Sequence, residues 1–485
     1  MTHGFSQPHP AAEILAALSP VQRLVADSLG QRWAEAGEEL FLVGGIVRDA
    51  LLDRPLPADL DLTTSALPHQ TEALATEAGA RSIFLIGQEY GTVGAVFGDE
   101  SDPDPVVVEI TTYRAEHYPD ETRFPEVRFG VSLDDDLARR DFTANAIAAD
   151  PRTGRLVDPF GGQADIALGV LRAVGDPDER FDEDPLRLLR AARFVAQLGF
   201  RIDAATEDAM GRHASALGRI SQERILSELT KLLTGDYVDH GLDLLGRTGV
   251  LVVALPEVAA LAREAAVGNR RERREKDLWD HTLRVVRQAP ARPLVRWAAL
   301  LHDAAKPLTR GIDEAGEIHF CGHERVGADL AARALQRLKA DKATLAGVTR
   351  LVELHGRPAA YEPDWTDSAV RRLVLEAGEV WDDLLDLAAA DVTSGREWKR
   401  RQAASRVAQL RQHVARLRAE ADLARLQSPL DGDELMRHFG RGPGIWIKHV
   451  KDHLRELVID GDLQPDDTAA AELVARAFLE SHPGH

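Results

Sequence analysis

The chain has 485 residues, so we expect about two to four packed units at roughly 100–200 residues per domain, which excludes a small disulfide-stapled fold. Hydrophobic residues make up 44% and charged residues 28%, and this ordinary globular composition excludes wholesale disorder. The net charge of −20 repels polyanions at long range, so any nucleic-acid site must be locally basic. A single cysteine, Cys321, the absence of a leader-like N-terminus and the lack of a run of about 18 apolar residues predict a soluble cytoplasmic protein without a membrane partner.

In chain order, the first predicted element is an amphipathic helix within Glu13–Ala36, where Leu, Val and Ala recur at helical spacing. Short apolar runs then predict the strands of an α/β or α+β sheet domain that ends near Asp150, and these runs are Phe41–Val43, Ser82–Ile86, Gly91–Phe97 and Val106–Ile110. Beyond Gly162 strand signals almost vanish, and helices are predicted over Asp184–Gln197, Thr206–Ala216 and Ser221–Leu233. The charged stretch Gly268–Lys276 is interpreted as a linker or a solvated helix.

The first chemical motif joins a glycine pair to two acids. Gly44 and Gly45 follow a predicted strand, where they allow close approach of a phosphate, although a plain turn explains such a pair equally simply. Asp59 and Asp61 alternate along the next strand, so both carboxylates can converge on one or two Mg²⁺ ions. Glu109 completes the cluster as a base or metal ligand, unless it is only an exposed strand acid. The pattern favours nucleotidyl transfer.

Two further motifs carry paired charges. The segment from Arg139 to Ala146 brings together arginine, aspartate and amide groups suited to triphosphate and ribose, or else it is a helix start capped by its aspartate. Downstream, Asp184 and Arg187 lie one helical turn apart and can read the amino group and ring nitrogen of cytosine or adenine, or else serve as a cap and a surface ion pair. The predicted nucleotide-binding residues are Gly44, Gly45, Arg48, Arg140, Asp141, Asn145, Asp184, Arg187, Arg190 and Arg193.

Taken together, these segments resemble the class II transfer-RNA nucleotidyltransferases, which comprise CCA-adding enzymes and bacterial poly(A) polymerases. The likeness is collinear from about Leu40 to Leu233 and includes Asp158-Pro159-Phe160-Gly161-Gly162 with Asp165, Glu183 in the base-recognition motif, and Ile220-Ser221 with Glu223-Arg224. The resemblance implies that Asp59 and Asp61 hold the catalytic metals and that CTP and ATP are added to tRNA without a nucleic-acid template.

Two segments bear on which nucleotides are added. Arg114–Phe129 is a polar stretch between predicted strands and resembles the flexible loop that family members need for adding the terminal A. Gly87–Val93 is similar to the CCA-enzyme form of this region. Full CCA addition is therefore the leading interpretation, and a poly(A) polymerase or an A-adding or CC-adding specialist is the alternative.

A histidine-rich constellation follows. His281, the His302-Asp303 pair and Asp391 can close around a divalent transition metal, although a lone histidine is more often filler. The context Leu300–Pro307 and Gly322-His323-Glu324 resembles the HD phosphohydrolase domain, which implies possible phosphohydrolase activity. His323 and His355 are candidates for a second metal or for a phosphate. A metal phosphohydrolase whose head only binds nucleotides is the rival from a different class.

An RNA surface is predicted in the basic stretch Arg396–Arg418, where phosphate contacts would recognise RNA shape, with a solvated helix paired to acidic neighbours as the alternative. Its candidate residues are Arg396, Lys399, Arg400, Arg401, Arg406 and Arg411. The predicted fold is α+β. It has an N-terminal helical segment (1–37), a polymerase beta-like mixed-sheet head (38–165), a helical neck (166–277), an HD domain (278–395) and a helical tail (396–485). The sequence leaves the oligomeric state open.

Overall fold

The computed structural model describes residues 11–86, 91–98, 105–117, 126–267, 278–314, 316–393, 397–419 and 428–482. Contacts divide the chain into two compact units, Met1–Ala259 and Ala260–His485. Within the described ranges, no helix is both long and apolar enough to cross a membrane. The charged stretch Gly268–Lys276 lies outside them.

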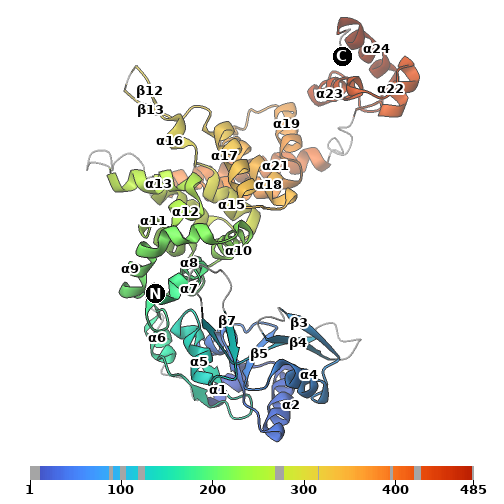
Figure 1. The fold of residues 1–485 in the computed structure, drawn as a ribbon. Coiled ribbons are helices and arrows are strands. Elements are labelled where there is room, and N and C mark those ends of the chain that lie inside the picture. The colour runs from blue at the N-terminus through green and yellow to red at the C-terminus, as the bar shows by residue number, and fades with distance from the viewer. Residues whose placement is uncertain are drawn as a thin grey trace. The chain divides into compact units, whose positions relative to one another are not determined.

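The first unit contains a mixed sheet, preceded by two helices, and continues as further helices (Figure 1). Its strands are β1 (Leu40–Val43), β2 (Leu60–Thr64), β3 (Ser82–Ile86), β4 (Thr92–Phe97), β5 (Val106–Thr112), β6 (Arg114–His117), β7 (Glu126–Phe129), β8 (Ala148–Ala149), β9 (Leu156–Val157), β10 (Val170–Leu171) and β11 (Arg201–Ile202). Its helices are α1 (Ala11–Ala17), α2 (Pro20–Ala36), α3 (Gly45–Leu51), α4 (Pro68–Glu77), α5 (Leu133–Ala138), α6 (Gly162–Leu168), α7 (Pro177–Glu183), α8 (Leu186–Leu198), α9 (Ala204–His213), α10 (Gln222–Leu233), α11 (Val238–Arg247) and α12 (Val250–Ala254), followed by α13 (Pro256–Val267) at the boundary between units. This mixed sheet followed by helices confirms the predicted α+β class.

The main sheet has the order β3-β4-β5-β2-β1-β8-β9. Only β2 and β5 are parallel among its paired neighbours, and their register places Asp61 opposite Glu109 and Thr63 opposite Thr111. Because side chains alternate along a strand, Asp61 and Thr63 share one face of β2. Helix α5 covers part of this face, where Leu133 and Leu137 pack in a buried cluster with the β1 residues Phe41 and Val43.

Three local expectations need correction. The single helix predicted within Glu13–Ala36 is two helices, because Ser19 caps a new helix at its Gln22 amide and Pro20 occupies the first turn. Asp59 immediately precedes β2 instead of lying within it, although it and Asp61 are both exposed on either side of buried Leu60. The polar stretch Arg114–Phe129 forms antiparallel strands, β6 and β7, at its two ends.

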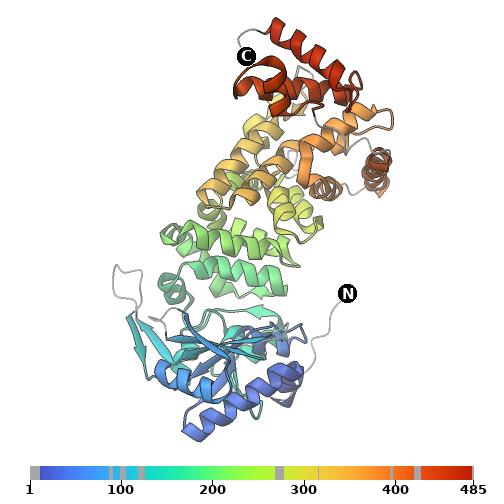
Figure 2. The same ribbon diagram turned by 90° about the vertical axis from the view of Figure 1, so that its right-hand side faces the viewer.

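Helices α8, α10 and α11 pack against one another beyond the sheet (Figure 2, green). Helix α8 is almost entirely buried, including Arg187 and Arg193, because neighbouring helices surround it. It starts after Asp184, near the predicted boundary. Its C-terminal end is tied to the sheet domain, since Arg54 donates to the Gln197 carbonyl at 2.9 Å.

The second unit is almost entirely helical. Its elements are α14 (Leu278–Gln288), α15 (Pro293–Leu301), α16 (Lys306–Thr309), β12 (Gly311–Ile312), β13 (Ile318–His319), α17 (His323–Arg337), α18 (Lys342–Leu354), α19 (Asp367–Ala377), α20 (Trp381–Ala390), α21 (Glu397–Ala419), α22 (Gly432–Phe439), α23 (Ile445–Asp460) and α24 (Thr468–Ser481). The last three helices share an apolar cluster that includes Trp446, Leu454 and Leu479.

Candidate functional site

Gly44 marks the turn between β1 and α3. Its φ of +73° lies in the region that favours glycine. A Cβ at this position would be 3.6 Å from Arg140 Nη1 and 3.9 Å from Asp61 Oδ2. The turn therefore brings the first two predicted motifs together around one glycine.

Asp61 and Glu109 form the acidic part of this site. They are cross-strand partners on β2 and β5, and Asp59 lies two residues before Asp61, which is one repeat of side-chain alternation along a strand. Burial against surrounding protein atoms raises the pKa of Asp61 to about 6. The negative charges of Glu109 and Asp59 also raise this pKa, whereas the positive charge of Arg140 lowers it. Solvent nevertheless reaches Asp61. A carboxylate held among like charges at an accessible position suits a divalent cation, which would relieve the repulsion.

A chain of polar contacts connects α3 to the neck helix α8. Arg48 Nη1 donates to Asn145 Oδ1 at 2.8 Å, and Asn145 Nδ2 donates to Asp141 Oδ1 at 3.0 Å. Arg190 Nε then donates to Asp141 Oδ2 at 2.7 Å. Burial alone would raise the pKa of Asp141, but Arg190 and the Asn145 amide lower it to about 2. Asp141 is thus a buried, ionised residue and not the surface helix cap of the alternative interpretation.

Aromatic stacking reinforces this chain. The Phe194 ring lies 5.1 Å from the Arg48 guanidinium, 5.5 Å from that of Arg190 and 4.3 Å from that of Arg193. Arg193 also pairs with buried Glu228 of α10 at 3.0 Å. Burial, together with neighbouring Arg190, lowers the pKa of Arg193 to about 10. Arg190 and Arg193 are therefore engaged mainly with protein groups.

The predicted base-reading pair makes separate contacts. Asp184 accepts from the Leu186 amide at 3.1 Å and pairs with Arg224 at 3.2 Å. Arg187 is buried and donates to Glu183 at 2.7 Å and to the Arg139 carbonyl at 2.7 Å. Arg187 consequently ties the neck to the segment that carries Arg140, and its role in reading a base stays a prediction.

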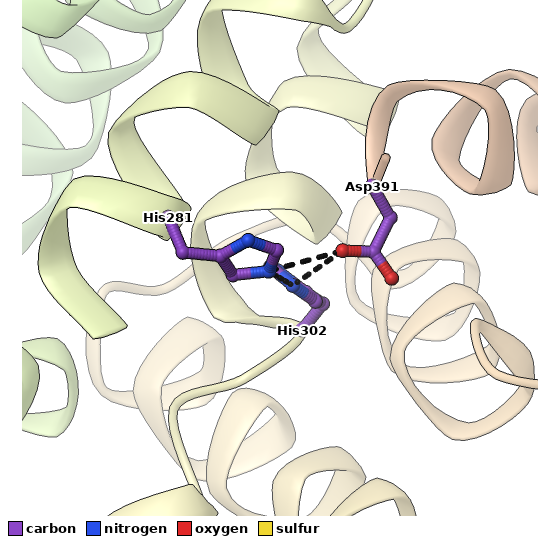
Figure 3. A group of neighbouring side chains, drawn as sticks. All are labelled: His281, His302 and Asp391. Atoms are coloured by element: carbon purple, nitrogen blue, oxygen red, sulfur yellow. Dashed lines mark hydrogen bonds and ion pairs between the residues drawn. The ribbon is translucent and has the colours of Figure 1, made fainter. Parts of the chain in front are cut away.

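The second unit holds a compact cluster of histidines and aspartates. Two groups have ligand atoms that all lie within 4.8 Å of one another: His281, His302 and Asp391 form one, and Asp303, His323 and His355 form the other. Among the described residues, these are the groups of three or more that meet this criterion, and Asp59, Asp61 and Glu109 do not form another. In Figure 3, both histidine rings of the first group point at Asp391, with His281 Nε2 3.0 Å from Asp391 Oδ1.

Each histidine of the cluster is anchored through Nδ1. His302, His323 and His355 approach the carbonyls of Ala299, Phe320 and Val352 at 2.8, 2.9 and 2.7 Å. His281 Nδ1 lies 2.7 Å from the Thr393 hydroxyl. A proton on Nδ1 that bonds to a carbonyl leaves the Nε2 lone pair free for a metal ion. The anchoring therefore orients the rings as ligands.

Asp303 belongs to the second group and also contacts the first. Its Oδ2 is 3.3 Å from His281 Nε2 and 2.6 Å from Lys306 Nζ. Its Oδ1 is buried 3.5 Å from His323 Nε2 and accepts no hydrogen bond from any described residue. Burial would raise its pKa, but His302, His281 and Lys306 lower it well below the usual range. An ionised oxygen without a hydrogen bond in such a place fits a metal ligand.

The basic helix α21 is largely committed to ion pairs within the second unit. Arg406 pairs with Glu362 at 3.0 Å, Arg411 pairs with Asp386 at 2.7 Å, and Arg401 pairs with Glu397. These contacts match the paired helix face that was the alternative to an RNA surface. Arg396 and the side chain of Lys399 lie outside the described residues.

Sequence reasoning did not single out several supporting residues. Asp136 contacts Thr63, Arg139 and Arg140 from α5, and Thr393 anchors His281 from beyond Asp391. Lys306, three residues after Asp303, carried the clearest signal, since a cation so close in sequence can reach the carboxylate across one turn of the chain. Asp136 carried no such signal in the sequence, because an acidic residue near the start of a helix is common.

Three family models match consecutive parts of the chain: the poly A polymerase head domain over residues 40–172, the probable RNA- and SrmB-binding site of polymerase A over 199–261, and the HD domain over 257–395. The chain is thus a poly(A) polymerase-type head joined to an RNA-binding neck segment and an HD domain. It belongs to the family that includes the CCA-adding enzymes, as the resemblance in sequence implied.

Curated relatives carry that name. A CCA-adding enzyme of Geobacillus sp. (strain WCH70) is 44% identical over 223 residues, which are 46% of this chain and 52% of the relative. That of Geobacillus kaustophilus (strain HTA426) is 40% identical over 291 residues, or 58% of this chain and 66% of the relative. The matched region therefore spans about half to two thirds of these relatives.

Solved structures extend the likeness. The Bacillus stearothermophilus CCA-adding enzyme in complex with CTP has a TM-score of 0.67 at 26% identity, covering 96% of this chain and 100% of that one. The Thermotoga maritima CCA-adding enzyme complexed with tRNA has a TM-score of 0.55 at 17% identity, covering 98% and 100%, and shows the shared fold.

Proposed function

We propose that this chain adds CCA to the 3′ end of tRNA from CTP and ATP, releasing pyrophosphate without a nucleic-acid template. The observation that carries the proposal is the convergence of Asp61, Glu109 and Arg140 beside the Gly44 turn. The named activity of the relatives supports it. A cytoplasmic location, where tRNA is matured, belongs to the same proposal.

Each side chain has a part in this reaction. Asp59 and Asp61 would hold Mg²⁺, which supplies charge stabilisation for the triphosphate and the attacking oxygen when bound. Glu109 lies where it can help orient the terminal 3′-hydroxyl or accept its proton. Arg140 presents donors to the triphosphate, while Arg48 and Asn145 hold the ribose side of the site.

On the neck, Asp184 and Arg187 would read the base. Asp184 must exchange its contact with Arg224, and Arg187 part of its contact with Glu183, for the cytosine or adenine edge. Arg190 and Arg193 would act in support through Asp141 and Glu228.

Incorporation of labelled nucleotides tests the proposal. tRNA transcripts ending before CCA or after CC, and an unrelated RNA, are incubated with Mg²⁺ and each nucleotide triphosphate alone or combined. Two C and one A that stop cleanly on tRNA support full CCA addition. Long A tails on any RNA identify a poly(A) polymerase instead, while C-only or A-only products identify a specialist.

Double variants distinguish the activity proposed for the first unit from the activity proposed for the second. Asp59→Ala with Asp61→Ala should abolish incorporation and leave any phosphohydrolase activity intact. Incorporation that survives this change contradicts the assignment of the head carboxylates.

A second activity is proposed for the HD cluster because ligand atoms from six residues converge there. A divalent transition metal held by His281, His302, Asp303 and Asp391 would supply an activated water for hydrolysis of phosphate esters. His302→Ala with Asp303→Ala should remove hydrolysis of a chromogenic phosphodiester or of a 2′,3′-cyclic phosphate RNA end, and should spare CCA addition. If no hydrolysis occurs with Mn²⁺, Ni²⁺ or Zn²⁺ present, the HD domain is not a phosphohydrolase.

RNA contact by α21 completes the proposal. Arg400, Arg401, Arg406 and Arg411 are spread along this helix, with Arg396 and Lys399 beside them in sequence. Exchanging the ion pairs of Arg406 and Arg411 for phosphates costs little, because exposed pairs contribute little stability. Replacing both by Gln should weaken tRNA binding and flatten its salt dependence.

A further inference from the structure

We propose that Asp136 is a positioning residue that holds the Arg140 guanidinium beside Asp61 and thereby sets where the triphosphate binds. The inference rests on the proposed nucleotidyl transfer and assigns a role to a residue outside the motifs that carry that function.

Asp136 is a completely buried acid on α5. Its Oδ2 accepts from Thr63 Oγ1 at 3.0 Å and from Arg140 Nη2 at 3.3 Å. Its Oδ1 accepts from Arg139 Nη2 at 2.7 Å and Nε at 3.0 Å. Burial alone would raise its pKa, but the two arginines lower it, so Asp136 is ionised. A buried carboxylate that is bonded on both oxygens is a rigid anchor for the groups around it.

These contacts connect Asp136 to the site from two directions. Thr63 is two residues after Asp61 and shares its face of β2, so the anchor is fixed to the strand that carries the acid. On the other side, the Arg140 guanidinium reaches the Gly44 turn next to Asp61 Oδ2. Arg140 Nε is buried and has no hydrogen-bond partner among the described residues. Arg140 Nη2 bonds to Asp136, while Nη1 lies beside Gly44, so Arg140 spans the distance between anchor and site.

The charge of Asp136 also affects Asp61. Arg140 Nη1 and Asp61 Oδ2 lie 3.6 and 3.9 Å from the same Cβ position at Gly44, so these opposite charges attract one another. A guanidinium without an anchor would pair with Asp61 and compete with a divalent cation for that carboxylate. The negative charge of Asp136 balances this attraction. It leaves Asp61 available to a cation and Arg140 available to phosphate oxygens.

The variant Asp136→Asn tests this role in the full-length chain because it keeps the size of the side chain and removes its charge. We expect the KM for CTP and for ATP, and the Mg²⁺ concentration for half-maximal rate, each to rise about tenfold, with kcat at saturation changed less than about threefold. The matched control is Asp165→Asn. Asp165 is also buried and also accepts from a threonine and an arginine, but these are Thr143 and Arg172 instead of Thr63 and Arg140. The control should lower the melting temperature without raising the Mg²⁺ requirement.

A double-mutant cycle with Arg140→Gln shows whether Asp136 acts through Arg140. If it does, Asp136→Asn adds less than about twofold to the KM of the Arg140→Gln variant. Fully additive effects, or an unchanged KM and Mg²⁺ requirement in Asp136→Asn, overturn the inference.

Thr63→Val provides a milder test in case Asp136→Asn does not fold. It removes one bond to Oδ2 and keeps the charge, so KM should rise about threefold, while Thr63→Ser, which retains the hydroxyl, should behave as the unaltered chain. Equal KM values for Val and Ser at this position count against the anchor. Failure of the proposed function is distinguishable, because the unaltered chain would then incorporate no nucleotide.

Discussion

Arg190 of α8 and Asp141 of the sheet domain form an ion pair, with Arg190 Nε 2.7 Å from the Asp141 carboxylate. The pair joins the helix that carries Arg187, one of the predicted base-reading residues, to the segment predicted to bind ribose. Within the first unit, this ion pair and the bond from Arg187 to the Arg139 carbonyl therefore hold the two segments together.

Arg190→Gln should destabilise the first unit, because it leaves the buried charge of Asp141 without its main partner. We expect a loss of roughly 3 kcal/mol in the free energy of unfolding, measured by urea denaturation. Arg212→Gln is the matched control, since Arg212 also pairs with an aspartate, Asp178, but at an exposed position. The control should unfold like the unaltered chain. Equal losses of unfolding free energy in the two variants would show that the buried Asp141 pair stabilises the chain no more than an exposed pair does.

Asp61→Asn should make the protein more stable at neutral pH. The pKa of Asp61 is about 6 in the folded chain against an ordinary value of 3.8, so between these pH values the folded state keeps a proton that the unfolded state has lost. Stability contributed by this group therefore falls as pH rises from about 4 to about 6 and stays low above that. Thermal melts without divalent ions should show the variant melting higher than the unaltered chain at pH 8 and equal to it near pH 4.

The same pKa predicts a pH dependence for activity. Protonation of Asp61 below about pH 6 removes a carboxylate charge that the cation needs, so the Mg²⁺ concentration for half-maximal incorporation should rise as the pH falls. A constant Mg²⁺ requirement between pH 5 and 8 would contradict the role of Asp61 as a ligand.

Metal ions should stabilise the second unit through the HD cluster. At a free metal concentration of about 100 times the dissociation constant, binding to the folded state alone adds about 2.7 kcal/mol, which is visible as a higher melting temperature. Asp303→Asn should remove this gain, because Asp303 contacts both groups of ligands. His438→Gln is the control, since His438 pairs with Glu472 away from the cluster, and it should keep the full gain.

Gly162→Ala should disturb the segment that holds Asn145. A Cβ at Gly162 would lie 2.2 Å from the Thr143 carbonyl oxygen, which is backbone and cannot move without shifting its neighbours. We expect a loss of about 1–3 kcal/mol in unfolding free energy together with weaker nucleotide binding. Gly211→Ala is the control, because a Cβ there would lie 3.9 Å from the Thr248 carbonyl oxygen, and it should have little effect on either measurement.

The sequence predicted well those features that have a local pattern. Short apolar runs predicted β3 and β5, and the adjacent His302 and Asp303, with their flanking sequence, indicated the cluster of candidate metal ligands. The break at Ser19-Pro20 was also local, but it interrupts an otherwise continuous apolar pattern and was missed. The register that places Asp61 beside Glu109 depends on pairing between distant segments, which one sequence does not reveal. For the same reason, the partners of Arg187 and Arg190 were not predictable.

Asp303 belongs to one group of ligands and contacts the other, so two ions in this cluster would share the Asp303 carboxylate. The first ion would draw electron density from the carboxylate that the second needs, and each ion would also repel the other. We therefore expect stepwise loading, with a second affinity weaker than the first. The metal occupancy of such a cluster would then increase gradually over a wide range of metal concentration instead of rising steeply at one concentration.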